Sequence, residues 1–208
     1  MGYTTNFNGE LKLSRPATER EMGYINRFTR SRRMKRDPKI LMKLYDGKHG
    51  HPTPVDQTPE GIYGPDGEFF AREDGQSGQY RDKSIIEYNH PPGQVGYGDK
   101  SMDGKKFDDT YKENHRRIEE GLCQPGLWCQ WELSDSETLQ WDEGEKFYYY
   151  TEWIKYLINH FFEPWGIKLN GEIEWDGEDS DDRGKIIVKD NVVKELVAKI
   201  TYIDPNEE

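Results

Sequence analysis

Hydrophobic and polar residues alternate in several short stretches of the chain, as they do in β-strands that bury one face. The clearest stretches are residues 7–13 (FNGELKL), 127–133 (LWCQWEL) and 169–175 (LNGEIEW). Each places apolar side chains or glycine at every second position. We therefore predict that all three stretches are half-buried strands.

Two further stretches extend this pattern into hairpins. Leu139 and Trp141 follow the second strand after a short polar turn, which predicts a return strand beside it. The apolar run 186–188 (IIV) and the segment 192–203 are separated by an Asp-Asn turn, which predicts another hairpin near the C-terminal end. The sheet is therefore expected to contain about five strands that pair antiparallel.

Other segments repeat their apolar residues at helical spacing. Thr18 and Glu21 have the spacing of a capping box, which predicts a helix over about 18–33. A second helix is predicted over about 145–163, where apolar residues form one broad face and acidic residues stand near the start. A short helix is also predicted near 109–120.

Residues 34–120 differ in composition from the rest of the chain. They contain eleven Gly and seven Pro, with short apolar clusters between the turn signals. We expect a long irregular region that lies over the core. The whole chain, residues 1–208, is thus predicted to be a single α+β domain, an antiparallel sheet of about five strands with two helices on one face.

Charge and the lack of targeting patterns narrow the expected location and partners. A formal net charge of −11 opposes direct binding to nucleic acid, which requires a basic surface. No apolar run is long enough to span a bilayer and no secretory signal stands at the N-terminus, so we expect a cytoplasmic location and no membrane association. Cys123 and Cys129 have the spacing of neither a redox pair nor a zinc knuckle, and reduced thiols are expected.

An aromatic flank lies beside the apolar face of the helix predicted over 145–163. It consists of Tyr149, Trp153, Tyr156 and His160. Because Tyr and Trp anchor many protein interfaces, this flank is interpreted as the wall of a ligand pocket or as a protein-binding hot spot. The alternative is that the long middle region simply covers it.

A basic cluster follows the first predicted helix of this otherwise acidic chain. It includes Arg32, Arg33 and Arg36. Guanidinium groups bind phosphate or carboxylate in a bidentate manner, so the cluster is a candidate anion site. The alternative is that these cations only complement the negative end of the helix dipole.

The acidic turn over 176–184 has the composition of a calcium loop but lacks the ligand spacing of one. A solvated hairpin loop is expected there, with an incidental Ca²⁺ or Mg²⁺ site as the alternative. The chain also lacks a phosphate-binding loop, a dinucleotide-binding motif and the usual hydrolase motifs. No cofactor, resident metal or catalytic residue is therefore predicted.

Four segments of the chain stand out together: RRMKRD (32–37), PGLWCQWEL (125–133), EKFYYYTEWIKYLI (145–158) and PWGIKLNGEIEWDGED (164–179). Together they resemble a family of small proteins, without an assigned activity, that occurs in bacteria and their viruses. The likeness covers the first 37 residues and most of the chain after residue 125, whereas about 94–120 looks like an insertion. It implies a cytoplasmic protein of a viral or mobile genome with a host-interaction or counter-defence role, and it gives no residue a function.

Three classes of function remain after these exclusions. The favoured one is a non-enzymatic binding protein that docks a host protein partner. A second is a protein that binds a nucleotide or a small phosphorylated ligand, with the Arg cluster holding phosphate and Tyr149, Trp153 or Tyr156 stacking on a base. The third is an unrecognised hydrolase that uses carboxylates and His160.

Overall fold

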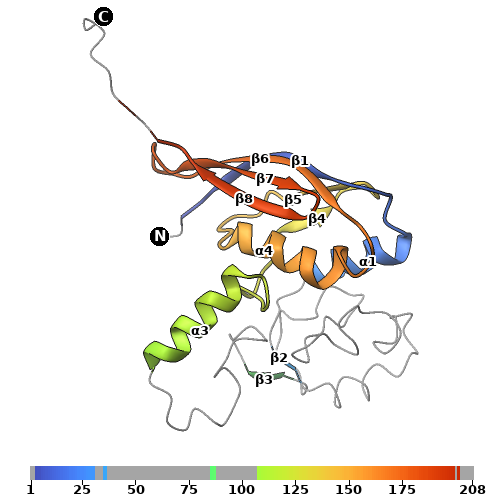
Figure 1. Ribbon diagram of the computed structural model, residues 1–208, viewed down its shortest axis with the longest axis horizontal. Coiled ribbons are helices and arrows are strands. Elements are labelled where there is room, and N and C mark those ends of the chain that lie inside the picture. Colours follow the sequence, from blue (N-terminus) through green and yellow to red (C-terminus); the bar gives the residue numbers. More distant parts are fainter. Residues whose placement is uncertain (1–2, 31–34, 37–84, 88–106, 200, 202–208) are drawn as a thin grey trace, which may run out of the picture.

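The computed structural model describes residues 3–30, 35–36, 85–87, 107–199 and 201 of the chain. The main sheet consists of β1 (Asn6–Leu13), β4 (Trp131–Leu133), β5 (Thr138–Trp141), β6 (Leu169–Asp176), β7 (Arg183–Lys189) and β8 (Val192–Val197). These six strands are antiparallel, in the spatial order β4-β5-β1-β6-β7-β8 (Figure 1). The α+β class is confirmed, with slightly more strands than expected. Strands β2 (Lys35–Arg36) and β3 (Ile85–Glu87) form a separate antiparallel pair.

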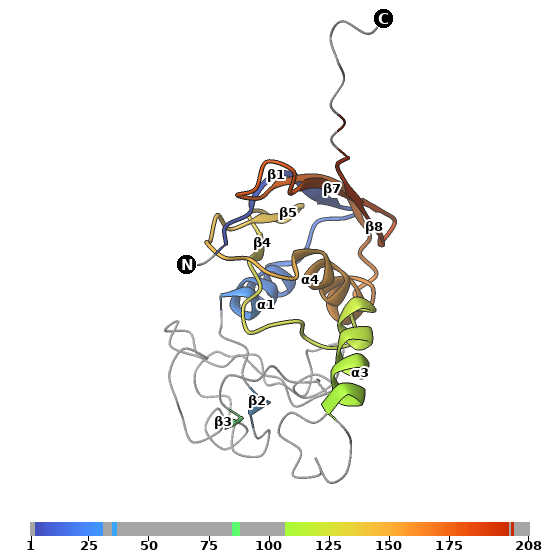
Figure 2. The same ribbon diagram turned by 90° about the vertical axis from the view of Figure 1, so that its left-hand side faces the viewer.

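Helices α1 (Glu19–Thr29) and α4 (Tyr150–Leu157) lie on the same face of the sheet, as predicted for two helices (Figure 2). The predicted short helix is α3 (Phe107–Glu119), which is attached to α4 by side-chain hydrogen bonds. Lys155 donates to the carbonyl oxygen of Glu119 at 3.0 Å, and Asn159 donates to that of Glu120 at 3.0 Å. Among the described residues, no helix has the length and apolar character that crossing a membrane requires.

The second main helix begins later than the sequence predicted. Residues 142–149 form a loop, and Glu143, Lys146 and Tyr149 in it have positive φ angles of 64°, 61° and 57°. L-residues cannot continue a right-handed helix in that conformation, so α4 starts at Tyr150. It then passes into a π-helical turn, Ile158–Phe162, so its predicted end is nearly correct. Phe147 is buried although it is not helical.

Other element ends also differ from the predictions. The strand predicted over 127–133 starts only at Trp131, because its partner Trp141 is the last residue of β5 before the chain turns away. The first helix ends at Thr29, and the last strand ends at Val197. Apart from β2, β3, α3 and Glu120, the irregular region predicted over 34–120 lies outside the described residues.

Two glycines allow the central strands β1 and β6 to approach each other. Gly9 and Gly171 have φ angles of +116° and +149°, which L side chains rarely adopt. They flank the directly opposed pair Glu10 and Glu172. A Cβ atom on Gly9 would collide with the carbonyl oxygen of Glu172, and one on Gly171 with that of Glu10. The repeated Asn-Gly-Glu tripeptide therefore serves the close pairing of these two strands.

A buried aromatic layer fills the space between the sheet and the helices. Phe7 of β1 lies within 4.8–5.8 Å, centroid to centroid, of four other aromatic rings. The indole nitrogen of Trp131 donates to the carbonyl oxygen of Tyr150 at 2.8 Å, which ties β4 to the start of α4. Aliphatic side chains from all layers complete the core: Leu11, Leu13, Ile25, Leu133, Leu139, Ile154, Leu157, Ile158, Ile167, Leu169, Ile173, Ile186 and Val188.

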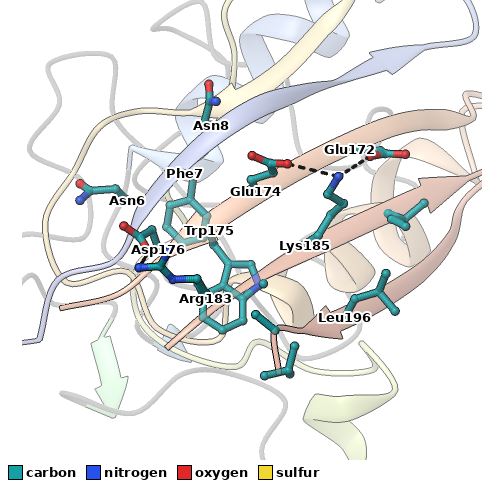
Figure 3. A pocket seen from close by; sticks show the side chains of 14 residues that line it. Asn6, Phe7, Asn8, Glu172, Glu174, Trp175, Asp176, Arg183, Lys185 and Leu196 are labelled. Atoms are coloured by element: carbon teal, nitrogen blue, oxygen red, sulfur yellow. Dashed lines mark hydrogen bonds and ion pairs between the residues drawn. The ribbon is translucent and has the colours of Figure 1, made fainter. Parts of the chain in front are cut away.

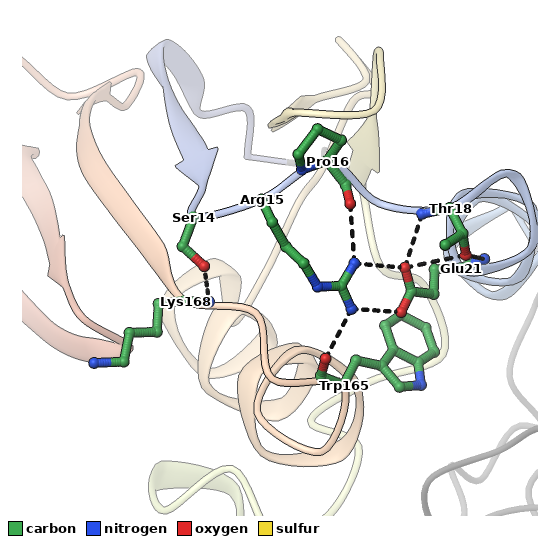
Figure 4. Close-up of polar contacts among 7 residues, drawn as sticks. All are labelled: Ser14, Arg15, Pro16, Thr18, Glu21, Trp165 and Lys168. Atoms are coloured by element: carbon green, nitrogen blue, oxygen red, sulfur yellow. Dashed lines mark hydrogen bonds and ion pairs between the residues drawn. The ribbon is translucent and has the colours of Figure 1, made fainter.

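An ion pair holds the two helices to the end of β1 (Figure 4). Arg15 donates to both carboxylate oxygens of Glu21, at 3.0 and 2.8 Å, and to the carbonyl oxygen of Trp165 at 2.8 Å. Glu21 also completes the predicted capping box, because its carboxylate accepts from the backbone N–H of Thr18 while the Thr18 hydroxyl accepts from the backbone N–H of Glu21. The chain following α4 and the first turn of α1 are thus joined through one carboxylate and one guanidinium.

We predict that Gly171→Ala lowers the free energy of unfolding by at least about 2 kcal/mol, because the added methyl group meets backbone in a strained conformation. Gly23→Ala is the matched control. It lies in α1 with no atom near its Cβ position, so it should stabilise the protein by about 0.5–1 kcal/mol. Urea denaturation of both variants checks this, and equal effects would contradict the close strand approach.

We also predict an acid-dependent loss of stability at Glu21. The hydrogen bonds from Arg15 lower the pKa of Glu21, so its stabilisation is complete above the pKa of an unfolded glutamate and is lost as the pH falls through the folded pKa. Glu21→Gln should reduce the unfolding free energy at neutral pH by about 1–2 kcal/mol.

Denaturation curves at several pH values should show this difference shrinking below about pH 4. Glu19→Gln, an exposed change in the same helical turn, serves as the control. If the difference in unfolding free energy between wild type and Glu21→Gln did not change with pH, the ionised Glu21 would not be the group that stabilises the fold.

Candidate functional site

The predicted aromatic flank does not form a continuous exposed wall. Trp153 and Tyr156 are 0% and 1% exposed, because Phe28 of α1 packs against them. Phe28 stacks on Tyr156 with centroids 5.8 Å apart and an angle of 12° between the rings. These two aromatic side chains therefore belong to the core, which corrects their predicted placement on a recognition surface. Tyr149, by contrast, is 52% exposed.

His160 is half-buried in the π-helical turn, where its ring stacks on Tyr156 at a centroid distance of 4.1 Å. The structure thus brings Trp153, Tyr156 and His160 into one series of ring contacts. Tyr149 stands apart from this series, at the N-terminal end of α4. Any role of these residues in binding stays a prediction.

The basic cluster is only partly described. Arg32 and Arg33 lie outside the described residues. Arg36 is in β2, where its Cα atom pairs with that of Ile85. The anion site proposed from these arginines therefore stays a prediction.

A groove of about 780 Å³ is lined mainly by residues on the face of the sheet opposite the helices (Figure 3). It runs over β1, β6, β7 and β8, and alternation in these strands directs their polar residues to this side. The residues that line it are Asn6, Phe7, Asn8, Glu172, Glu174, Trp175, Asp176, Arg183, Gly184, Lys185, Ile187, Leu196, Val197 and Ala198. Sequence reasoning predicted the strands but missed this groove.

Charged side chains in the groove neutralise one another across neighbouring strands. Lys185 lies 3.0 Å from the carboxylate of Glu172 and 3.2 Å from that of Glu174, which raises the pKa of Lys185. Arg183 lies 3.3 Å from the carboxylate of Asp176. Such exposed pairs add little stability, so their main effect is to set the charge pattern of the surface.

Apolar side chains continue the groove toward β8. Ile187 is half-buried, whereas Leu196 and Val197 are 40% and 69% exposed. Trp175 also lines the groove although it is almost fully buried. The groove therefore joins hydrogen-bonding amides and paired charges to an apolar end at β8.

Another hollow, of about 480 Å³, lies beside the first. It shares Asn6, Phe7 and Asn8 with the groove and adds Gln140 and Trp141 of β5. The start of β1 is thus flanked by concave surface on both sides. The signal in the sequence was the pair of polar residues, Asn6 and Asn8, on a strand whose other face is buried.

The acidic turn is held by the N-terminal segment. Thr4 donates its backbone N–H to the carboxylate of Glu178 at 2.7 Å. The hydroxyl of Tyr3 donates to Asp182 and accepts from the backbone N–H of Asp179 at 3.2 Å. Within the described part of the chain, no group of three or more His, Cys, Asp or Glu side chains is placed to hold a metal ion. The cation alternative at this turn is not supported by a ligand cluster.

The two cysteines are both buried thiols and do not line the groove. No protein family, curated protein or solved structure matches the chain. The resemblance to small proteins of bacteria and their viruses is therefore neither supported nor opposed by these comparisons.

We predict that Trp153→Ala lowers the free energy of unfolding by about 3–5 kcal/mol, since it empties a core position between α1 and α4. Tyr149→Ala, an exposed aromatic at the start of the same helix, should change it by less than about 1 kcal/mol. Chemical denaturation monitored by circular dichroism checks both variants. Similar losses for the two would show that the buried face of α4 is assigned wrongly.

Proposed function

We propose that the chain is a non-enzymatic binding protein that docks a protein partner on the open face of its sheet. The observation that supports this most strongly is the groove over β1, β6, β7 and β8, with its mixture of amides, paired charges and apolar side chains. Protein interfaces likewise combine apolar contact area with polar, hydrogen-bonding side chains.

The charge arrangement favours a protein over a phosphorylated ligand at this groove. Lys185 and Arg183 are already paired with carboxylates of β6, so neither offers an uncompensated positive charge to phosphate. The three carboxylates outnumber these two cations, which opposes a nucleic-acid backbone. A nucleotide-binding function would instead depend on Arg32 and Arg33.

The class of partner is proposed from the resemblance drawn from the sequence. A host protein is the proposed partner, which fits a cytoplasmic host-interaction or counter-defence role. The net charge of −11 agrees with a soluble protein that meets a less acidic surface.

Affinity capture from a host lysate with the full-length chain tests this function. Ile187→Lys, which puts a charge in the groove, should remove the captured protein. Tyr111→Lys introduces the same charge at an exposed aromatic side chain of α3, which belongs neither to the groove lining nor to β8, and it should retain the protein. Thermal melts establish that both variants are folded.

Native mass spectrometry of the purified chain tests the alternative that the protein binds a small ligand. A retained small molecule, together with no captured protein, would replace the proposal with the ligand-binding alternative. Capture that Ile187→Lys leaves unchanged would move the docking surface away from the groove.

A further inference from the structure

Strand β8 directs part of its backbone away from the sheet. The register pairs Gly184 with Val197, and the N–H of Ala198 donates to the carbonyl oxygen of Arg183 at 2.8 Å. Hydrogen-bonded and non-hydrogen-bonded pairs alternate in an antiparallel ladder. The backbone groups of Val192, Lys194 and Leu196 therefore point to β7. Those of Val193, Glu195 and Val197 point to the opposite side.

That opposite side is an edge, since β8 pairs only with β7 among the strands that the structure describes. Its apolar side chains are open to solvent, with Val192 70% exposed and Val197 69% exposed. Natural edge strands are usually short or carry a proline or several charges to prevent pairing. The sequence VVKELV has no proline and only two charges of opposite sign. The opposite edge, β4, is only three residues long.

A second copy of this chain fits the edge poorly. A twofold axis that relates two antiparallel β8 strands must set one residue opposite itself. The registers that pair the most residues are centred on Lys194 or on Glu195, and they place two like charges in direct opposition. The edge is therefore suited to a strand of different sequence.

The charges beside the edge indicate what that strand would carry. Glu195 is opposite buried Ile186, so its side chain leans to the helical side of the sheet, toward α4. Helix α4 lies against β8. Burial raises the pKa of Glu152 in α4, and the charges of Glu195 and Glu119 both raise it further. We call these three residues the acidic corner. Lys155 is the cation that offsets part of this charge.

Side chains on the open face of β8 have a different character. Leu196 is opposite Lys185 and lines the groove, and Val192 is exposed on the same side. A strand beside β8 would therefore meet the carboxylates together with Val193 and Val197 on one face, and Val192, Leu196 and Lys194 on the other. Because side chains alternate along a strand, the complementary sequence alternates basic and apolar residues.

We propose that β8 accepts an extended segment of the protein partner as an additional strand, with its basic side chains toward the acidic corner and its apolar side chains over Val192 and Leu196. Main-chain hydrogen bonds to Val193, Glu195 and Val197 hold this segment, as in strand addition generally. The inference rests on the proposed function, because it specifies how the partner on the open face is held.

A short fluorescent peptide in which valine and lysine alternate is the probe, and fluorescence anisotropy with the full-length chain is the measurement. Val197→Pro removes one edge-facing N–H without touching the β7 ladder and should weaken binding about fivefold. Val197→Thr, which keeps the N–H and the β-branched shape, should bind like wild type. Thermal melts confirm that both variants fold.

The acidic corner is tested by charge reversal. Glu195→Lys should weaken binding of the valine–lysine peptide about tenfold and improve binding of a valine–glutamate peptide. Equal binding by Val197→Pro and Val197→Thr, or no binding of the valine–lysine peptide to wild type, would overturn the inference. A wild-type dimer that Val197→Pro converts to a monomer would assign the edge to a second copy instead.

Affinity capture separates this inference from the proposed function. If Ile187→Lys loses the captured protein while Val197→Pro retains it, the groove docks the partner without strand addition. If neither variant alters capture, the proposed function and the strand addition fail together. Loss in both variants, with retention in Val197→Thr, supports the two proposals.

Discussion

The pairing of β1 with β6 is the constraint on which the rest of the structure depends. Eight residues of β1 lie opposite eight of β6, from Asn6 with Asp176 to Leu13 with Leu169. On its other side β1 pairs with β5, so this one strand unites the β4–β5 hairpin with the β6–β7–β8 meander. Without this long-range contact the two hairpins would share neither a sheet nor a core, because a hairpin alone is marginally stable.

The same pairing gives the sheet one face that the helices cover and one face that they leave open. Arg15 and Glu21 join the start of α1 to the chain that follows α4, immediately after β1, which places the helices beneath the apolar side chains of the sheet. The polar side chains of the central strands then have no helical cover among the described elements (Figure 2). The groove exists on that side because Asn6 and Asn8 are brought next to strands that follow them by more than 160 residues.

The groove and the β8 edge, the two parts of the proposed surface, differ in their charge. Within the groove, carboxylates and cations are matched across strands and present little net charge. At the edge, where β8 contacts α4, the negative charges of Glu195 and Glu119 both act on Glu152. The charged edge would orient a bound partner, because charge complementarity contributes mainly to specificity. The groove would supply most of the contact area.

The sequence by itself determined the α+β class, the order of the main strands and helices, and the cap at Thr18, because periodicity and capping are local properties. It did not determine which aromatic side chains are exposed. Trp153 and Tyr156 lie beside the apolar face of α4, and only the packing of Phe28 from a distant helix decides that they are buried. The groove and the edge of β8 likewise arise from strand order and register, which depend on contacts between residues far apart in the chain.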